Sequence, residues 1–149
     1  MSDLAKMREL SNSVCIVGVD ESDELGTLPG KSQLSLHVEA ITNAVRDAGL
    51  KVSDVDGIFT AGQHSPATIG EAIGVVPRYV DGTTVGGCSF IIMVGHAVLA
   101  LHHGLCDVAV VSHGESGRSG VGVSPRRDTA LPASSSSPTA SAARRPTSA

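Results

Sequence analysis

Cys88 stands between a glycine pair and a long apolar stretch, in the segment TTVGGCSF of residues 83–90. If that stretch is a helix, Cys88 lies at its N-terminus, where unpaired N–H groups and the helix dipole favour a thiolate. A thiolate there could attack an acyl carbonyl and hold the acyl group as a thioester. Gly86, Gly87 and Ser89 would leave room for the substrate beside it. Cys88 is therefore a candidate catalytic nucleophile, and its three neighbours are candidate substrate-binding residues.

A second interpretation of Cys88 requires no chemistry. Cysteine is among the most frequently buried residue types, and its small side chain fits a tight corner beside two glycines. No basic side chain is identifiable from the sequence as the partner that would activate the thiol. From the residues alone, the nucleophile and the corner-filling side chain both stay open.

The other two cysteines and the histidines give weaker signals. Cys15 and Cys106 are expected to be inert core thiols, because three cysteines match no metal-ligand pattern and make a poor disulfide framework. His96 and His103 are seven positions apart and could share a helix face, but no carboxylate stands at ligand spacing beside them. No metal site is therefore expected.

Apolar periodicity predicts where these residues sit. A helix is expected from Ser32, its N-cap, to Gly49, its stop, because apolar residues recur there in steps of four and three. A short helix is expected within residues 68–74. The run from residue 89 to 104 predicts a helix that is apolar on nearly every side and therefore buried inside the protein.

Short β-branched runs predict the strands. These are a buried strand at residues 14–20 (VCIVGVD), a strand around residues 58–60, an extended piece at residues 78–85 and a strand at residues 107–115. His113 and Glu115 end the last strand, where functional residues of open α/β sheets gather, although ordinary turn residues stand there too. The alternation of strands and helices is typical of a layered α/β domain.

Composition excludes several classes of function. The formal charge of −4 leaves no basic surface for a nucleic acid. The N-terminus lacks the basic and apolar regions of a signal peptide, and no apolar run is long enough to span a membrane. We expect a cytoplasmic location with reduced cysteines.

Three segments are expected along the chain: an N-terminal extension at residues 1–13, a folded part at 14–120 and a tail at 121–149. Leu131 is the only large apolar side chain in residues 124–149, so that stretch cannot offset the entropy of ordering. The tail is therefore expected to be disordered.

The pattern as a whole resembles the thiolase superfamily, in its sterol-carrier or lipid-transfer branch. The resemblance covers residues 14–118, in the segments VCIVGVDESDELG, LSLHVEAITNAVRDAGL, VSDVDGIFTAG and YVDGTTVGGCSFIIMVGHAVLALHHGLCDVAVVSHGES. It implies the layered αβαβα fold of the thiolases. This chain would hold an incomplete version, the N-terminal half-domain followed by the tail.

Thiolases join or cleave acyl chains through a cysteine thioester, with coenzyme A as the acyl carrier. The resemblance therefore implies an acetyl-CoA acetyltransferase-like enzyme of fatty-acyl or sterol side-chain metabolism. Its substrate would be an acyl-CoA or sterol-CoA thioester, with no bound cofactor. Intact relatives are expected to form homodimers or to need a partner protein.

The family's nucleophile can be aligned here in two ways. Its pattern at the start of the apolar helix resembles C-x-S-G. Matching Cys88 to the family cysteine puts Ile91 where the glycine should be, whereas matching Ser89 to the motif serine puts Gly87 in the cysteine's place. Many lipid-transfer relatives have a GGAS-like segment without a cysteine, so the second alignment is slightly better.

The family's catalytic histidine and second cysteine lie in its C-terminal half-domain, which this chain is expected to lack. One set of codons for LPASSSSPTASAARRPTSA lets another reading frame spell a segment with GQFEFPYG, which resembles the continuation in lipid-transfer thiolases. A frameshift near residues 130–133 is therefore a hypothesis, and sequencing of the gene across that point tests it.

Two functions follow from the resemblance. The first is a truncated thiolase-like acyl-CoA acyltransferase with little or no activity alone. The alternative is a non-catalytic or aldolase-type scaffold that binds acyl-CoA or a sterol side chain and needs a partner protein. A third hypothesis, a small interaction domain unrelated to thiolases, rests on no motif.

Overall fold

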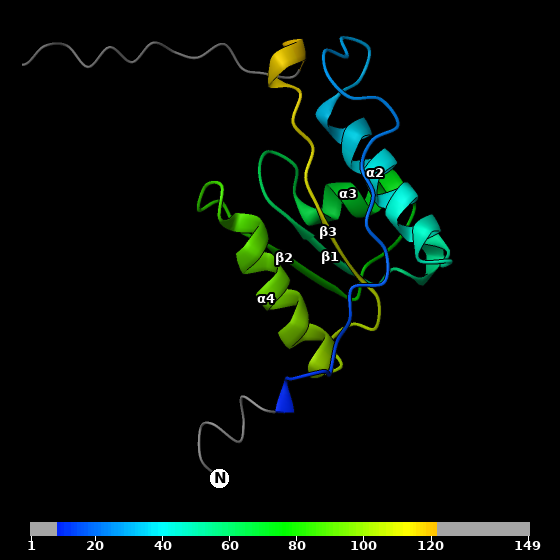
Figure 1. The fold of residues 1–149 in the computed structure, drawn as a ribbon, viewed down its shortest axis with the longest axis vertical. Coiled ribbons are helices and arrows are strands. Elements are labelled where there is room, and N and C mark those ends of the chain that lie inside the picture. The colour runs from blue at the N-terminus through cyan, green and yellow to red at the C-terminus, as the bar shows by residue number, and fades with distance from the viewer. Residues whose placement is uncertain (1–8, 122–149) are drawn as a thin grey trace, which may run out of the picture.

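A three-stranded parallel sheet forms the centre of the computed structural model, which describes residues 9–121 (Figure 1). The strands are β1 (Gly57–Thr60), β2 (Tyr79–Gly82) and β3 (Ala109–Ser112), in the order β2-β1-β3. Residues 1–8 and 122–149 lie outside the described residues, and with them lie most of the predicted N-terminal extension and the tail predicted to be disordered.

Helices cover both faces of the sheet. α2 (Gln33–Asp47) and α3 (Pro66–Ile73) pack on one face, and α4 (Ser89–His102) packs on the other (Figure 1). Two short 3₁₀ helices, Val52–Asp54 and Gly117–Ser119, complete the elements. The described residues thus form a layered α/β fold with helices on either side of a parallel sheet, as the sequence predicts.

Local sequence determines where α2 begins and ends. Ser32 is its N-cap, and the Ser32 hydroxyl accepts a hydrogen bond from the Ser35 N–H at 3.1 Å. Gly49 follows the helix with φ of +69°, a left-handed conformation that favours glycine. The face with Ile41 and Val45 is buried. The prediction of this helix is confirmed.

Strand β1 lies in the middle of the sheet, and each of its residues is buried. Successive side chains point to opposite faces, so Ile58 joins the core under α2 and α3, while Phe59 joins the core under α4. Both side chains are completely buried. The expected strands at β1 and β3, and the short α3, are confirmed.

Helix α4 is only half covered. Met93 and Ala97 pack against the sheet, but Ile91 is 77% exposed and Leu99 is 45% exposed. The prediction of a helix here is confirmed, whereas full burial is wrong for this structure. The reason is that the described residues cover α4 on its sheet-facing side and leave its other side to solvent.

Residues 14–20 form no strand, so that prediction is wrong. They run as an extended segment beside α2 (Figure 1), and Ile16 is 76% exposed. Val19 N–H donates to the Asp47 carboxylate of α2 at 3.0 Å, and Gly18 packs against Ala48 so closely that a Cβ would clash. The segment is therefore attached to α2 rather than paired with the sheet.

The three cysteines have different surroundings. Cys15 lies on the extended segment and is exposed, so the prediction of a core thiol is wrong there. Cys106 is buried beside Gly57 and packs in the core under α4. Burial raises the pKa of the Cys106 thiol, which keeps it protonated, as expected of an inert core thiol.

No helix within residues 9–121 is long and apolar enough to cross a lipid bilayer.

Candidate functional site

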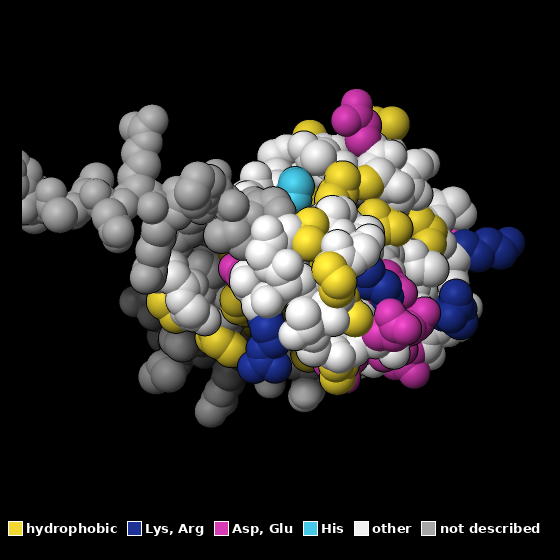
Figure 2. Space-filling view, turned by 90° about the horizontal axis from the view of Figure 1, so that it is seen from above, with side chains coloured by type: hydrophobic (Ala, Val, Ile, Leu, Met, Phe, Trp, Pro, Cys, Tyr) yellow, Lys and Arg dark blue, Asp and Glu magenta, His cyan; other side chains and the backbone are white. Residues whose placement is uncertain are grey.

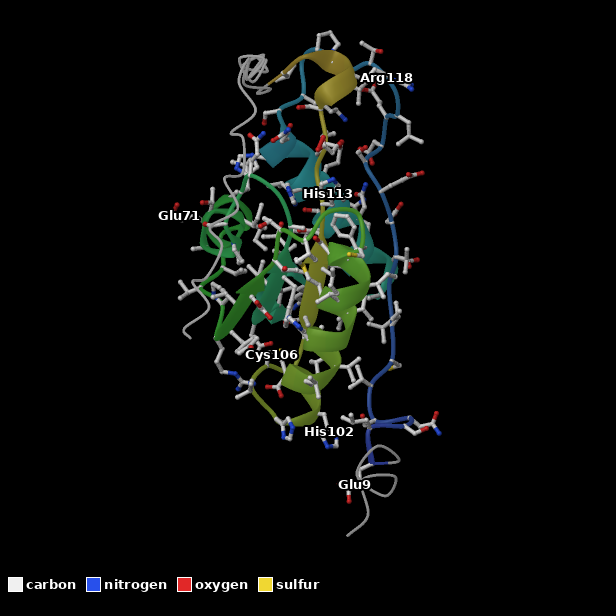
Figure 3. The ribbon with its side chains drawn as sticks, turned by 90° about the vertical axis from the view of Figure 1, so that its left-hand side faces the viewer. Glu9, Glu71, His102, Cys106, His113 and Arg118 are labelled. Carbon is white, nitrogen blue, oxygen red and sulfur yellow. The ribbon has the colours of Figure 1, made fainter. Side chains whose placement is uncertain are left out.

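The carboxyl ends of the parallel strands meet at one end of the molecule, where α2 and α4 also begin (Figure 1). Ligands of open α/β sheets bind at this edge, because loops and helix N-termini converge there. His113, which follows β3, lies at this end, whereas His102 and Cys106 lie at the opposite end (Figure 3). The candidate site is therefore built from the residues at this edge.

The loop before α4 is held by Ser89. Its hydroxyl donates to the Gly86 carbonyl at 2.7 Å and accepts from the Val85 N–H at 3.2 Å, and the side chain is 1% exposed. Gly86 has φ of +85°, which favours glycine, and a Cβ on Gly87 would meet nothing within 4 Å. Ser89 thus folds the loop, and Gly87 borders open space.

Cys88 precedes the first residue of α4 and is exposed. Its thiol donates to the Val85 carbonyl at 3.4 Å, and the side chain makes no capping hydrogen bond. Within the described residues, the hydrogen bond of this thiol goes to a carbonyl and not to a histidine. A thiol without a base has no partner to take its proton, which a nucleophilic cysteine requires.

Three histidines gather at the same edge from three parts of the chain. His37 comes from α2, His64 from the loop after β1, and His113 from the end of β3. The His37 ring centroid lies 5.9 Å from that of His64 and 6.2 Å from that of His113, both edge to face. Viewed from this end, a histidine side chain reaches the surface (Figure 2).

His37 is the buried member of this cluster, with 1% of its surface exposed. Its Nδ1 forms a hydrogen bond with the Ser112 hydroxyl at 3.0 Å. Burial, followed by the neighbouring His113 and His64, lowers the pKa of His37 from 6.5 to about 4. The ring is therefore neutral near pH 7 and suits a structural or hydrogen-bonding role.

His113 is the exposed member and connects the cluster to α4. Its ring packs on Phe90, one residue into the helix, with centroids 4.6 Å apart. Its Nδ1 lies 3.4 Å from the Ala61 carbonyl, which can only accept, so Nδ1 carries the proton. In the neutral ring, Nε2 then keeps a lone pair that can accept a proton from a ligand.

Thr60 adds a polar group to this edge. It is 2% exposed, and its hydroxyl is the buried side-chain atom without a hydrogen-bond partner in the described part of the chain. It pairs in register with Ser112, so both side chains point to the face that holds His37. A buried unpaired hydroxyl costs about 1–3 kcal/mol, which a bound water or ligand would recover.

The remaining predicted residues lie elsewhere or act structurally. His96 bonds Asp81 of β2 through its Nδ1 at 2.6 Å, which attaches α4 to the sheet. The His102 and His103 rings stack edge to face at the far end of α4. No group of three or more His, Cys, Asp or Glu within residues 9–121 is arranged to hold a metal ion.

Sequence reasoning named His113 and the loop around Cys88, but it missed His37, His64 and Thr60. Hydrogen-bonding and stacking contacts join residues far apart in the chain, such as His37 and Ser112, which are 75 positions apart. One local signal could have pointed to His37. It lies on the buried stripe of α2, and a buried titratable side chain needs a hydrogen-bond partner.

No model of a known protein family matches the chain. A curated relative, the 17-hydroxy-3-oxo-4-pregnene-20-carboxyl-CoA lyase of Mycobacterium tuberculosis, is 33% identical over 115 residues, which are 75% of this chain and 30% of the relative. The chain therefore spans about a third of the length of this relative.

Two solved structures are similar to this fold. The Ltp2-ChsH2(DUF35) aldolase is 31% identical with a TM-score of 0.65, over 71% of this chain and 28% of that one. A monomeric SCP2-thiolase-like protein type 1 from Mycobacterium smegmatis is 25% identical with a TM-score of 0.54, over 64% of this chain and 22% of that one. The described residues of this protein have a thiolase-like α/β fold.

Proposed function

We propose that this chain is the part of an aldolase-type enzyme that binds a coenzyme A thioester at the carboxyl edge of the sheet. The observation that carries the proposal is the placement of the polar groups. The histidines gather around His37 and His113, whereas the Cys88 thiol forms its hydrogen bond with a backbone carbonyl. The similarity to a CoA lyase and an aldolase supports this choice.

An aldolase of this kind cleaves a carbon–carbon bond without a protein thioester. A base takes the proton of a hydroxyl, that carbon becomes a carbonyl, and the bond to the carbon beside the thioester breaks. The electron pair moves to the thioester as an enolate, which then takes up a proton. His113 Nε2 suits the base, and the N–H groups of Phe90 and Ile91 in the first turn of α4 suit the developing enolate oxygen.

The substrate class and partner belong to the same proposal. A steroid CoA thioester is supported by the printed name of the relative, 17-hydroxy-3-oxo-4-pregnene-20-carboxyl-CoA lyase. We also propose that a partner polypeptide contributes further residues of the site. The two-component name of the Ltp2-ChsH2(DUF35) aldolase supports a partner. Homodimerisation stays a prediction.

Binding of 17-hydroxy-3-oxo-4-pregnene-20-carboxyl-CoA to the full chain, followed by calorimetry, tests the proposal. We expect a 1:1 complex that His113→Gln weakens by about tenfold, a loss of about 1.4 kcal/mol. His102→Gln, at the far end of α4, should bind like the wild type. Equal weakening by both substitutions, or no binding by any variant, would contradict the assignment of the site.

A second function, thioester formation at Cys88, is favoured by one observation: the thiol is exposed beside the open space at Gly87. Incubation with acetyl-CoA followed by peptide mass spectrometry separates the two functions. The aldolase-type proposal predicts no acetyl group on Cys88 beyond the level on Cys15, which is also free and exposed. Selective acetylation of Cys88, abolished in Cys88→Ala and retained in Cys15→Ala, would favour the acyltransferase.

A further inference from the structure

The ring of Phe90 lies against the ring of His113, the residue that follows β3. The two ring centroids are 4.6 Å apart, and the ring planes are tilted by 57°. Aromatic rings at this separation attract one another beyond the effect of the area that they bury. The contact joins the start of α4 to the end of β3, at the edge of the sheet where the candidate site lies (Figure 3).

The other contacts of His113 hold its ring less closely. Its Nδ1 lies 3.4 Å from the Ala61 carbonyl, which is long for a hydrogen bond. The His37 ring meets it edge to face, with centroids 6.2 Å apart. By contrast, the ring of His96 is bonded to the Asp81 carboxylate at 2.6 Å. The contact with Phe90 is therefore the closest ring contact that fixes the plane of His113.

Helix α4 is attached to the sheet without this contact. Met93 is completely buried against the sheet, and His96 of the same helix bonds Asp81 of β2. Phe90 is only partly buried beside this core. Because other residues attach the helix, the Phe90 ring can serve to orient His113.

Orientation determines which nitrogen of His113 can act as a base. With Nδ1 directed at the Ala61 carbonyl, that nitrogen carries the proton, and Nε2 keeps its lone pair. A ring that turns away from this carbonyl loses the bond that selects this tautomer. Phe90 is also the second residue of α4, so its own N–H belongs to the first turn of that helix. The ring contact therefore keeps the base beside these donors.

We propose that Phe90 is a positioning residue, which holds the His113 ring with Nδ1 on the Ala61 carbonyl and Nε2 free to accept a proton. The Phe90 ring has no group that exchanges a proton, so it acts through His113. The proposal rests on the proposed function for the use of that lone pair. The orientation of the ring can be measured without a ligand.

Nitrogen–proton correlation NMR of the isotopically labelled full chain tests the orientation, because the two tautomers of an imidazole differ in their nitrogen chemical shifts. Alkaline pH keeps the imidazoles neutral, and the spectrum of His113→Gln identifies the His113 signals. We expect the wild type to carry the proton on Nδ1. In Phe90→Leu the ratio of this tautomer to the Nε2–H tautomer should fall by about 2- to 10-fold, as expected when an aromatic pair is lost. Phe90→Tyr keeps the ring and should keep the wild-type ratio.

Two further variants complete this test. Ile91→Ala is the matched control, because Ile91 lies in the same turn of α4 with 77% of its side chain exposed, and it should keep the wild-type ratio. Phe90→Met is a second apolar side chain without a ring and should lower the ratio as Phe90→Leu does. The proposal would be overturned by an unchanged ratio in both variants without the ring, by an equal fall in Ile91→Ala, by a wild type with the proton on Nε2, or by loss of the folded state in both variants without the ring.

Calorimetric titration with 17-hydroxy-3-oxo-4-pregnene-20-carboxyl-CoA separates this proposal from the proposed function. Phe90→Leu should weaken binding by about 2- to 10-fold, and Phe90→Tyr should bind within about twofold of the wild type. Binding that His113→Gln weakens and Phe90→Leu leaves unchanged would overturn the positioning role. A tautomer change in Phe90→Leu without binding by the wild type would contradict the proposed function and still support the orientation of His113 by Phe90.

Discussion

Helices α2 and α4 cover opposite faces of one sheet, yet they differ in how well the chain buries them. α2 alternates apolar and polar residues, and its apolar stripe with Ile41 and Val45 lies against the sheet. α4 has no ionisable residue except its histidines. It buries Met93 and Ala97, but Ile91 stays 77% exposed.

The difference shows what amphipathic patterning provides. An apolar stripe marks one buried face, and a single layer of sheet is enough to cover it. A helix that is apolar all round needs cover on both sides, and the described residues supply one. Within the described residues the outer surface of α4 therefore stays exposed, whereas Ile58 and Ile69 in the core under α2 and α3 are completely buried.

The largest expected change in unfolding free energy distinguishes the buried side of α4 from its exposed side. Met93→Ala removes a completely buried side chain and should lower the free energy of unfolding by about 2–5 kcal/mol. Ile91→Ala removes a side chain that is 77% exposed and should change it by less than about 0.5 kcal/mol. Denaturant unfolding measures both. Similar losses would mean that the outer face of α4 is covered in solution.

The next largest effect is the pH dependence of the unfolding free energy that His37 on α2 causes. The pKa of His37 is about 4 in the folded protein and 6.5 as a free side chain, so the unfolded chain binds the extra proton first. Stability is therefore complete above pH 6.5 and falls by about 3 kcal/mol as the pH drops to 4.

Replacing His37 should remove this dependence. His37→Gln can still bond Ser112, so its unfolding free energy should vary less between pH 6.5 and 4 than that of the wild type. His102→Gln, at the exposed end of α4, should keep the wild-type pH profile. An unchanged profile in His37→Gln would show that another group causes the acid sensitivity.

Two glycines at the candidate site differ in how closely other atoms surround them. A Cβ on Gly114 would clash with the Gln33 carbonyl of α2 and lie 2.8 Å from the His37 ring, whereas one on Gly87 would meet nothing within 4 Å. Gly114→Ala should therefore cost about 1–3 kcal/mol. Gly87→Ala should cost less than about 1 kcal/mol. Thermal unfolding distinguishes them, and equal melting temperatures would contradict this account.

Local signals made most of the fold predictable. The cap at Ser32, the stop at Gly49 and the β-branched runs each act within a few residues, so α2, β1 and β3 follow from the sequence. The segment at residues 14–20 has the same β-branched character, but a strand also needs a neighbour. In this structure the segment contacts α2 instead of pairing with a neighbouring strand. No local sequence pattern predicts that contact.

The candidate site was less predictable for a related reason. The sequence pointed to Cys88 because its neighbours suggest a helix N-terminus, and the structure places it there. The contacts between His37, His64 and His113 depend on how α2 packs on the sheet, and spacing along the chain does not encode them. The burial of Ser89 and its hydrogen bonds to Val85 and Gly86 also depend on the folded loop, so the spacing of residues does not predict them.

The smallest expected change in unfolding free energy comes from substitutions at the starts of α2 and α4. Ser32→Ala removes the hydroxyl that accepts the Ser35 N–H and should lower the free energy of unfolding by about 1 kcal/mol. Cys88→Ala removes a thiol that makes no capping bond and should change stability by less than about 0.5 kcal/mol. Urea unfolding of the two variants provides the measurement. A larger loss for Cys88→Ala would mean that its thiol, through the Val85 carbonyl, holds the start of α4 as firmly as Ser32 holds that of α2.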